Sequence, residues 1–304
     1  SKKTSIRIDK TAPKIELNGP ASSSEINNSN NVTIPIKITE TASGINNSEF
    51  TASDISVLIN GTTVNPSTKA LTYNSVSNGV YSYTLTLSGI TLNGKVTLEI
   101  ATGAVKDIAT NSNVKTTLDP SITVSNIYTI SLNGNGATTA GTPAIYEKYN
   151  TGIYLDSALK NVMTTTTNKI TVPAKTGYTF KGYYTKENGQ GDQIINENGY
   201  ITDKATNTTY IANTTLYAYW IDNIAPEITE LINTSNGNWT NQTIGITVKA
   251  TDLGSGIKRF DYSYDNKNWV TTWTNGTITD ITNGKQRYDT WAAERNEPNT
   301  YFRV

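Results

Sequence analysis

The sequence predicts an all-β fold, and three of its features support this prediction. Apolar and polar residues alternate along many short segments, which is typical of strands with one buried face. The chain is rich in Thr (52 residues), which favours strands, and in Asn (36 residues), which favours turns. Only residues 156–163 have the pattern of a short helix, with Asp156 or Ser157 as its N-cap.

Two segments repeat and indicate how the 304 residues are organised. Ile-Asp followed by Ala-Pro occurs at residues 8–13 and again at 221–226. An alternating strand, an acidic residue and Ser-Gly-Ile follow each copy, which indicates two related β-domains with another domain between them. The predicted parts are a leading strand or linker at 1–9, a first domain at 10–125, a middle domain at 126–221 and a last domain at 222–304.

The first and last domains have the strand count of immunoglobulin-like β-sandwiches. The predicted strands of the first domain are 32–38, 55–59, 81–87 and 96–100, with a hairpin turn at Asn60-Gly61. The predicted strands of the last domain are 244–250, 260–264, 269–273, one near Tyr288 and 301–304. Residues 5–8 are similar to 301–304, so we expect them to be the terminal strand of a preceding unit. End-to-end self-association through Ser5 to Ile8 is one expected outcome, and an added edge strand or a disordered segment is the other.

The middle domain has a different pattern of predicted strands. Its predicted strands are 128–132, 144–149, 152–155, 169–174, 178–185 and 215–220. A turn at 133–136 follows the first of them. Because Trp220 ends this domain where the next begins, we predict that its side chain is mostly buried.

Charge and composition exclude several classes of function. Lys plus Arg equals Asp plus Glu at 25 each, so the net charge of +0 argues against a nucleic-acid partner. With no Cys and no His, the chain has no thiol nucleophile, no His general base and no Cys or His zinc site. We therefore predict no enzyme activity and name no catalytic or cofactor-binding residue. There is no apolar run long enough to span a membrane, and the scarcity of oxidisable side chains fits an extracellular location.

Three stretches of the middle domain resemble the Listeria–Bacteroides repeat, also called the internalin B-repeat. They are YTISLNGNG at 128–136, GYTFKGYYT at 177–185 and TLYAYW at 215–220. Tyr183 stands where that family usually has Trp, and 156–168 looks like an insertion. The resemblance implies a small β-grasp-like domain over about 95 residues.

The flanking domains resemble bacterial immunoglobulin-like repeats of secreted and surface proteins. KTAPKIEL, GVYSYTLTL and GAVKDIATNSN carry the resemblance in the first, and IAPEITEL and WAAERNE carry it in the last. The last departs from the family's usual Asp-x-Ala-Gly-Asn turn. Together the blocks resemble a multi-repeat Gram-positive-type cell-surface protein.

Two kinds of candidate binding residue stand out. Acidic loop residues could bind calcium, which needs six to eight oxygen ligands. The calcium candidates are Asp252, Asp261 and Asp265, and further acidic loop residues are Glu40, Asp54 and Asp107. Turn chemistry is the alternative role for these carboxylates. Tyr178, Tyr183, Tyr184 and Tyr219 could form an aromatic strip that binds a ligand, and core packing is the alternative role for these rings.

These observations lead to one principal hypothesis and two others. The principal hypothesis is a non-catalytic extracellular segment of a bacterial surface protein, three β-domains in a row that act as a stalk or spacer and contribute to adhesion. Prolines at the domain junctions would limit bending. The second is an adhesin that binds a host glycan or a cell-surface protein through the middle domain. The third is an accessory region of a secreted hydrolase whose catalytic domain lies elsewhere.

Overall fold

The computed structural model describes residues 6–233, 244–257, 259–263, 266–274, 279–281, 284–293 and 301–304. These residues form an almost entirely β structure whose one α-helix is the single turn α1 (Asp203–Thr206), which confirms the predicted fold class. The chain divides into two compact units. The first comprises Ser1–Ser131, Ala144–Met163 and Thr206–Thr214, and the second comprises Leu132–Pro143, Thr164–Ala205 and Thr215–Val304. No helix of the described residues is both long and apolar enough to cross a bilayer.

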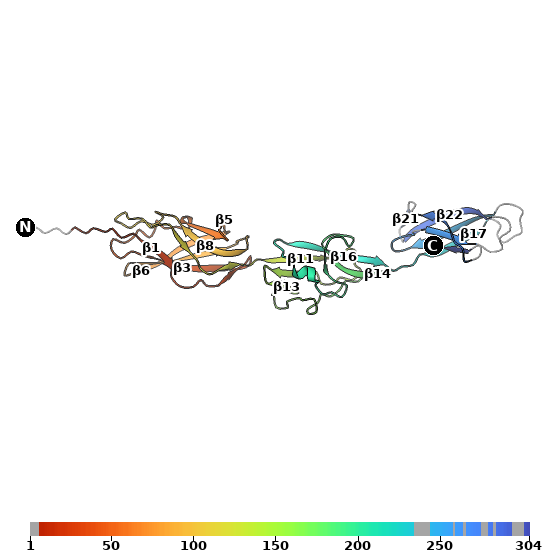
Figure 1. The fold of residues 1–304 in the computed structure, drawn as a ribbon, viewed down its shortest axis with the longest axis horizontal. Coiled ribbons are helices and arrows are strands. Elements are labelled where there is room, and N and C mark those ends of the chain that lie inside the picture. Colours follow the sequence, from red (N-terminus) through yellow and green to blue (C-terminus); the bar gives the residue numbers. More distant parts are fainter. Residues whose placement is uncertain are drawn as a thin grey trace, which may run out of the picture. The chain divides into compact units, whose positions relative to one another are not determined.

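Two sheets form a β-sandwich at the start of the chain (Figure 1). The first sheet has the order β1 (Lys14–Leu17), β3 (Asn31–Thr39), β7 (Val80–Ser88) and β6 (Thr68–Ser77). The second has the order β2 (Glu25–Ile26), β10 (Thr123–Val124), β8 (Gly94–Ile100), β4 (Ile55–Ile59) and β5 (Thr62–Val64), with β9 (Thr116–Leu118) also paired to β8. The alternating pattern predicts four of these strands but not β6, because that strand is largely exposed and has no clear apolar alternation.

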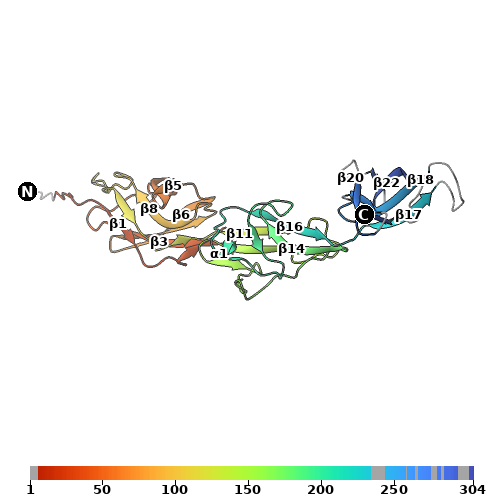
Figure 2. The ribbon, with the colours of Figure 1, turned by 45° about the vertical axis from the view of Figure 1, so that its right-hand side comes forward.

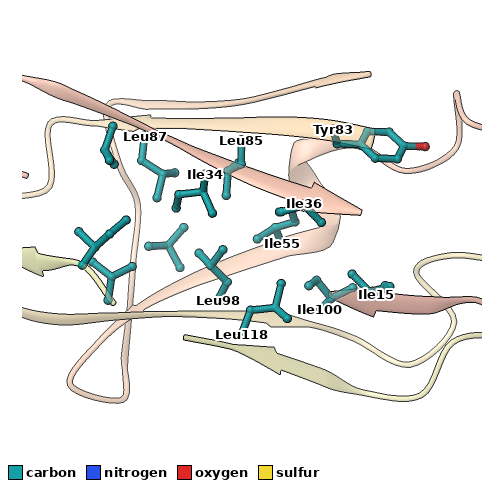
Figure 3. Packing of buried hydrophobic residues seen from close by; sticks show 14 of the residues in the cluster. Ile15, Ile34, Ile36, Ile55, Tyr83, Leu85, Leu87, Leu98, Ile100 and Leu118 are labelled. Carbon is teal, nitrogen blue, oxygen red and sulfur yellow. The ribbon is translucent and has the colours of Figure 1, made fainter. Parts of the chain in front are cut away.

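Alternate residues of the strands fill the space between these two sheets. In β3, every second side chain from Val32 to Ile38 is buried, while the side chains between them are only partly covered. Figure 3 shows Ile34, Ile36, Leu85 and Leu87 facing the side chains of the other sheet. The predicted turn at Asn60-Gly61 is present, with positive φ at both residues (48° and 83°), as the tight hairpin between β4 and β5 requires.

A third sheet has six strands. Their order is β13 (Gly152–Tyr154), β12 (Ala144–Lys148), β11 (Ile127–Asn133), β16 (Thr214–Asp222), β14 (Tyr178–Tyr184) and β15 (Gln193–Ile195). The five strands predicted at 128–132, 144–149, 152–155, 178–185 and 215–220 are confirmed.

Two further sheets lie at the end of the chain. The first has the order β17 (Glu227–Asn233), β18 (Ile244–Asp252), β22 (Gly284–Ala293) and β21 (Thr279–Ile281). The second has the order β20 (Val270–Thr274), β19 (Arg259–Ser263) and β23 (Tyr301–Arg303). Figure 2 shows β18 and β22 side by side, as their nine-pair register requires. The described core of this sandwich is formed by Val248, Ala250, Ile257 and Phe260.

Residues 156–163 do not form the predicted helix. The Asp156 carboxylate accepts hydrogen bonds from the backbone N–H groups of Lys160 and Asn161 and from the Asn161 side chain, which closes a loop. Leu159 has a φ of 56°, which an α-helix excludes. Asx-turn chemistry therefore prevails over helix propensity in this segment.

Three other expectations concern residues 169–174, Trp220 and the segment 5–8. Residues 169–174 contribute only an isolated bridge, Ala174 to Thr139, and no strand. Trp220 is mostly buried, as predicted: its ring packs edge-to-face against Phe180 with centroids 5.4 Å apart, and its indole Nε1 donates to Gly134 O at 3.0 Å. In the segment 5–8, Ser5 lies outside the described residues, and residues 6–8 are in no strand. The side chains of Ile6 and Ile8 are 82% and 77% exposed.

Glu147 on β12 is a buried carboxyl that should make stability depend on pH. Its side chain is 4% exposed, and burial raises the pKa of Glu147 from 4.5 to about 7 although it accepts the Tyr210 N–H at 3.0 Å. The unfolded chain therefore loses this proton at a lower pH than the folded chain does. As a result, stability decreases as pH rises from about 4.5 to about 7, by roughly 3 kcal/mol at most.

We expect Glu147→Gln to remove this part of the pH dependence, because Gln keeps the acceptor for Tyr210 without a charge. Calorimetric unfolding of both proteins between pH 4 and pH 8 measures the effect. The control is Glu197→Gln, which changes an exposed carboxyl. An unchanged pH profile in Glu147→Gln would contradict the assignment.

Candidate metal centre

Three carboxylates converge at one end of the first sandwich. Asp9, Glu40 and Asp107 each place one carboxylate oxygen so that all three oxygens lie within 4.8 Å of one another. The side chains of Glu40 and Asp107 are 2% and 4% exposed, and Asp9 is half-buried. We call this group the acidic cluster. Its members come from three separate segments, so only the folded chain brings them together.

Glu40 enters the cluster because of its position directly after β3. The buried residues of β3 are even-numbered, from Val32 to Ile38, so the next inward position is Glu40. Its backbone N–H donates to Gly79 O at 2.8 Å. Gly79 has a φ of 73°, and a Cβ there would lie 2.5 Å from Glu40 O, so the close approach requires glycine.

The two oxygens of the Glu40 carboxylate differ in their surroundings. Oε1 accepts the N–H groups of Ala42 at 2.7 Å and Ser43 at 3.3 Å. The same Ser43 N–H lies 3.0 Å from Asp9 Oδ2, so the Glu40 and Asp9 carboxylates face a common donor. Oε2 is fully buried and has no hydrogen-bond partner.

Asp107 lies in the loop after β8, which its own side chain organises. Asp107 Oδ1 accepts the Asn111 N–H at 2.7 Å, and Oδ2 accepts the Asn111 side-chain amide at 2.7 Å. That amide also donates to Asp9 O at 3.2 Å, which connects the loop to the segment before β1. Ile108 N–H donates to Gly44 O at 2.9 Å and joins this loop to the turn after Glu40.

The charges of the cluster are not balanced by basic side chains. Among the described residues, the salt bridges involve other acids, and none reaches Asp9, Glu40 or Asp107. At a separation of 4.8 Å, two unit charges repel by roughly 3–4 kcal/mol with an effective dielectric constant of about 20. The arrangement has the donor set for a hard cation, since its ligand atoms are oxygens.

The last sandwich repeats part of this arrangement. Asp222 takes the place of Asp9, Asp252 that of Glu40 and Ser255 that of Ser43. Asp252 is 2% exposed, and its Oδ1 accepts the N–H groups of Gly254 and Gly256 at 2.8 Å each. Asp222 Oδ2 accepts the Ser255 N–H, as Asp9 Oδ2 accepts that of Ser43. The predicted sequence repeat thus corresponds to a repeated set of hydrogen bonds.

The other calcium candidates lie in different surroundings. Asp261 on β19 is buried between two guanidinium groups, with Arg303 Nε at 2.7 Å and Arg259 Nε at 3.1 Å. Two cations of the chain already lie against this carboxylate, so core ion pairing is the role that its surroundings favour over calcium binding. Asp265 lies outside the described residues. Asp54 accepts the Thr51 N–H at 2.7 Å and caps a short 3₁₀ turn, so turn chemistry is its role.

The four candidate tyrosines divide between core and surface. Tyr183 is 1% exposed and packs against Phe180 with ring centroids 5.4 Å apart, which favours core packing, the alternative role for this ring. Burial raises the pKa of Tyr183 to about 12. Tyr184 and Tyr219 are half-buried and form an edge-to-face pair at 5.7 Å. Lys175 Nζ lies 4.2 Å from the ring centre of Tyr178, so that ring already binds a cation of the chain itself.

Sequence analysis named Glu40 and Asp107 as acidic loop residues and did not connect them with Asp9. The available signal was the repeat, since Ile-Asp precedes Ala-Pro in both copies and an acid follows the alternating strand in both. Local patterns could not show that the first acid of each copy folds back onto the second. In the first copy, the hydrogen bond that brings Asp9 to this turn comes from Ser43, 34 positions away.

No protein-family model matches the chain, and no curated protein matches it. Among solved structures, the chain is similar to the crystal structure of Down Syndrome Cell Adhesion Molecule (DSCAM) isoform 1.30.30, N-terminal eight Ig domains, at 7% identity and a TM-score of 0.24. That match covers 96% of this chain and 42% of the crystallised chain that it matches. It is also similar to domains A168-A170 from titin, at 8% identity and a TM-score of 0.24, over 90% of this chain and 87% of that one. These TM-scores are too low to indicate a shared arrangement, so the class of the protein, an all-β chain with immunoglobulin-like sandwiches, follows from the sheets themselves.

The ion pairs of Asp261 generate a prediction about the last sandwich. Burial alone would raise the pKa of Asp261, but hydrogen bonds from Arg303 and Thr271 and the charge of Arg259 bring it below the ordinary 3.8. The ionised Asp261 carboxylate therefore stabilises the folded state above pH about 4, and this contribution is lost as pH falls through the folded-state pKa. We expect Asp261→Asn to destabilise this sandwich by about 1–3 kcal/mol at pH 7 and by less near pH 3.

Calorimetric unfolding at the two pH values measures the difference. Glu227→Gln is the control, because it removes an exposed carboxylate from the same sandwich. Equal stability of Asp261→Asn and the unmodified protein at pH 7 would show that the two arginines do not stabilise the fold through Asp261.

Proposed function

We propose that the chain is a non-catalytic extracellular segment of a bacterial surface protein and acts as a spacer. The observation that carries this proposal is a polar network within the first compact unit, where the first sandwich continues into β11. A spacer must resist bending where one set of sheets leads into the next, and this network holds that point. The sequence resemblances to surface-protein repeats support the bacterial and extracellular parts of the proposal.

Two asparagines form the centre of the network. The side-chain amide of Asn126 donates to Ile90 O and Thr91 O, each at 3.0 Å. Its backbone N–H donates to Asn93 Oδ1 at 2.8 Å, and Asn93 Nδ2 donates to the Tyr128 hydroxyl at 2.8 Å. Asn126, Asn93 and Tyr128 are 2%, 9% and 8% exposed, so these bonds are shielded from water.

Two further contacts lie beside the asparagines. The Asn28 side chain bonds to both backbone groups of Ile127, donating to its O at 2.7 Å and accepting from its N–H at 3.3 Å. Lys148 Nζ on β12 lies 2.8 Å from each carboxylate oxygen of Glu25 on β2. These contacts join residues that are about 100 or more positions apart in sequence.

Bending at this point would break several of these bonds together. A buried amide that loses its partner costs about 1–3 kcal/mol unless water replaces the partner. Because Asn126 bonds to the turn at 90–91 and to Asn93 at once, a hinge at residue 126 would leave more than one such group unpaired. The network therefore favours one orientation of β11 against the first sandwich.

Distance measurements between paired spin labels test the proposal. The chain has no cysteine, so Thr63→Cys with Lys160→Cys labels two exposed positions of the first unit and nothing else. We expect a narrow distance distribution that broadens clearly in the double variant Asn93→Ala/Asn126→Ala. Asn74→Ala is the control, because its bond to Thr84 lies inside the first sandwich. If the distance distribution is as broad in the labelled protein with the intact network as in the double variant, the spacer proposal is overturned.

One observation favours adhesion as a second function. The edge-to-face rings of Tyr184 and Tyr219 are half-buried, and neighbouring aromatic rings with polar tips suit contact with sugars or with a protein partner. Gly189 packs closely against the Tyr219 ring, where a Cβ would lie 2.8 Å from it, so one face of this ring is already covered. The surface of the two rings that Gly189 does not cover is the part that would contact a host glycan or protein.

Binding to an immobilised glycan panel tests this second function. We expect Tyr184→Ser to weaken any binding of the unmodified chain at least about tenfold, in the range of aromatic contact residues. Tyr149→Ser, which changes a half-buried tyrosine outside the pair, should bind as the unmodified chain does. Equal binding by all three proteins would exclude the tyrosine pair as the contact surface.

A further inference from the structure

We propose that Asp9, Glu40 and Asp107 form a calcium-binding site that holds the segment entering the first sandwich. The three carboxylates lie close enough together to share one ion. The independent observation that points to a ligand is Glu40 Oε2, an oxygen of a side chain that is 2% exposed, which is buried without any hydrogen-bond partner. A buried carboxylate oxygen normally has a donor or a cation as its partner.

The orientation of Glu40 supports its role as a ligand. Its carboxylate and that of Asp9 share the Ser43 N–H, so Glu40 lies beside Asp9 at the end of the sandwich core. Oε1 accepts backbone N–H groups and stays fixed by them. Oε2 is left for a partner that the protein itself does not supply among its described residues.

A set of three carboxylates favours calcium over magnesium, because magnesium usually keeps several waters and binds through one or two carboxylates. Calcium binds oxygen at about 2.3–2.6 Å, so two ligands of one ion are at most about 5.2 Å apart. Ligand atoms within 4.8 Å of one another fit the calcium limit as they stand. Zinc is disfavoured because the chain has no Cys and no His.

The surrounding chain holds the ligands in place. The Asn111 amide fixes Asp107 through two hydrogen bonds, and it also reaches the backbone of Asp9. Calcium would add direct bonds between the same segments. Its ligands come from the segment before β1, the residue after β3 and the loop after β8, so an ion would connect the entering chain to two loops of the sandwich.

A ligand that binds only the folded protein stabilises it in proportion to the logarithm of its concentration. Extracellular calcium modules typically have dissociation constants of about 10⁻⁴–10⁻³ M. We expect the full chain to bind Ca²⁺ in this range by isothermal titration calorimetry. We also expect millimolar Ca²⁺ to raise its unfolding temperature, with a much smaller effect of equimolar Mg²⁺.

Variants at the cluster distinguish this site from other acids. Asp107→Asn should weaken calcium binding at this site by about tenfold or more, because it removes one charged ligand. Asp119→Asn is the matched control, since it removes an exposed carboxylate of the same sandwich that pairs with Lys95. If Asp107→Asn does not fold, Asp9→Asn gives the same test with a half-buried residue that precedes the first strand.

Three results would overturn the proposal. The first is an unmodified chain with neither a binding heat nor a shift in unfolding temperature at 10 mM Ca²⁺. The second is equal calcium affinity in the Asp9 or Asp107 variant and the Asp119 variant. The third is binding that Asp222→Asn abolishes and the Asp9 and Asp107 variants leave intact, which would place the ion in the last sandwich instead.

Discussion

The period-two alternation of β3 and β18 is the constraint on which the acidic residues of both sandwiches depend. Val32 to Ile38 fill one core and Val248 and Ala250 fill the other. The next inward positions are Glu40 and Asp252, each 2% exposed. Because side chains alternate strictly across a sheet, an acid two residues beyond the last apolar position has to face inward at the end of the core.

An inward acid then determines the structure around it. A buried carboxylate needs donors, and the nearest are the backbone N–H groups of the turn that follows: Ala42 and Ser43 after Glu40, and Gly254 and Gly256 after Asp252. The Ser N–H of each turn is also the donor for an aspartate that enters from upstream. Glycine recurs where this packing is closest. A Cβ at Gly254 would clash with the Asp222 carboxylate.

Residue patterns predict the parts of this fold that depend on local alternation. The strands at 32–38, 81–87, 96–100 and 178–185 follow from it, and so does the hairpin at Asn60-Gly61. The features that these patterns do not predict depend on single side chains, which bond to the backbone or to residues far away in the sequence. Asp156 closes a loop where helix signals were present, and the acidic cluster requires a contact from Asp9 to the turn after β3. Asp261 shows the same limit, because no local pattern could indicate that Arg303, 42 positions away, neutralises it.

The position of β3 relates the spacer role to the acidic cluster. Asn28, just before this strand, bonds to Ile127, and Glu40, just after it, belongs to the cluster with Asp9. All nine residues of β3 pair with the nine residues of β7, and the last four of them, residues 36–39, also pair with β1. A strand of this length spans about 30 Å at roughly 3.3 Å per residue. Tension between Asp9 and Ile127 would therefore act on a strand that is paired with β7 along its whole length and has a polar anchor at each end, and a cation at Asp9 would add direct bonds to one of these anchors.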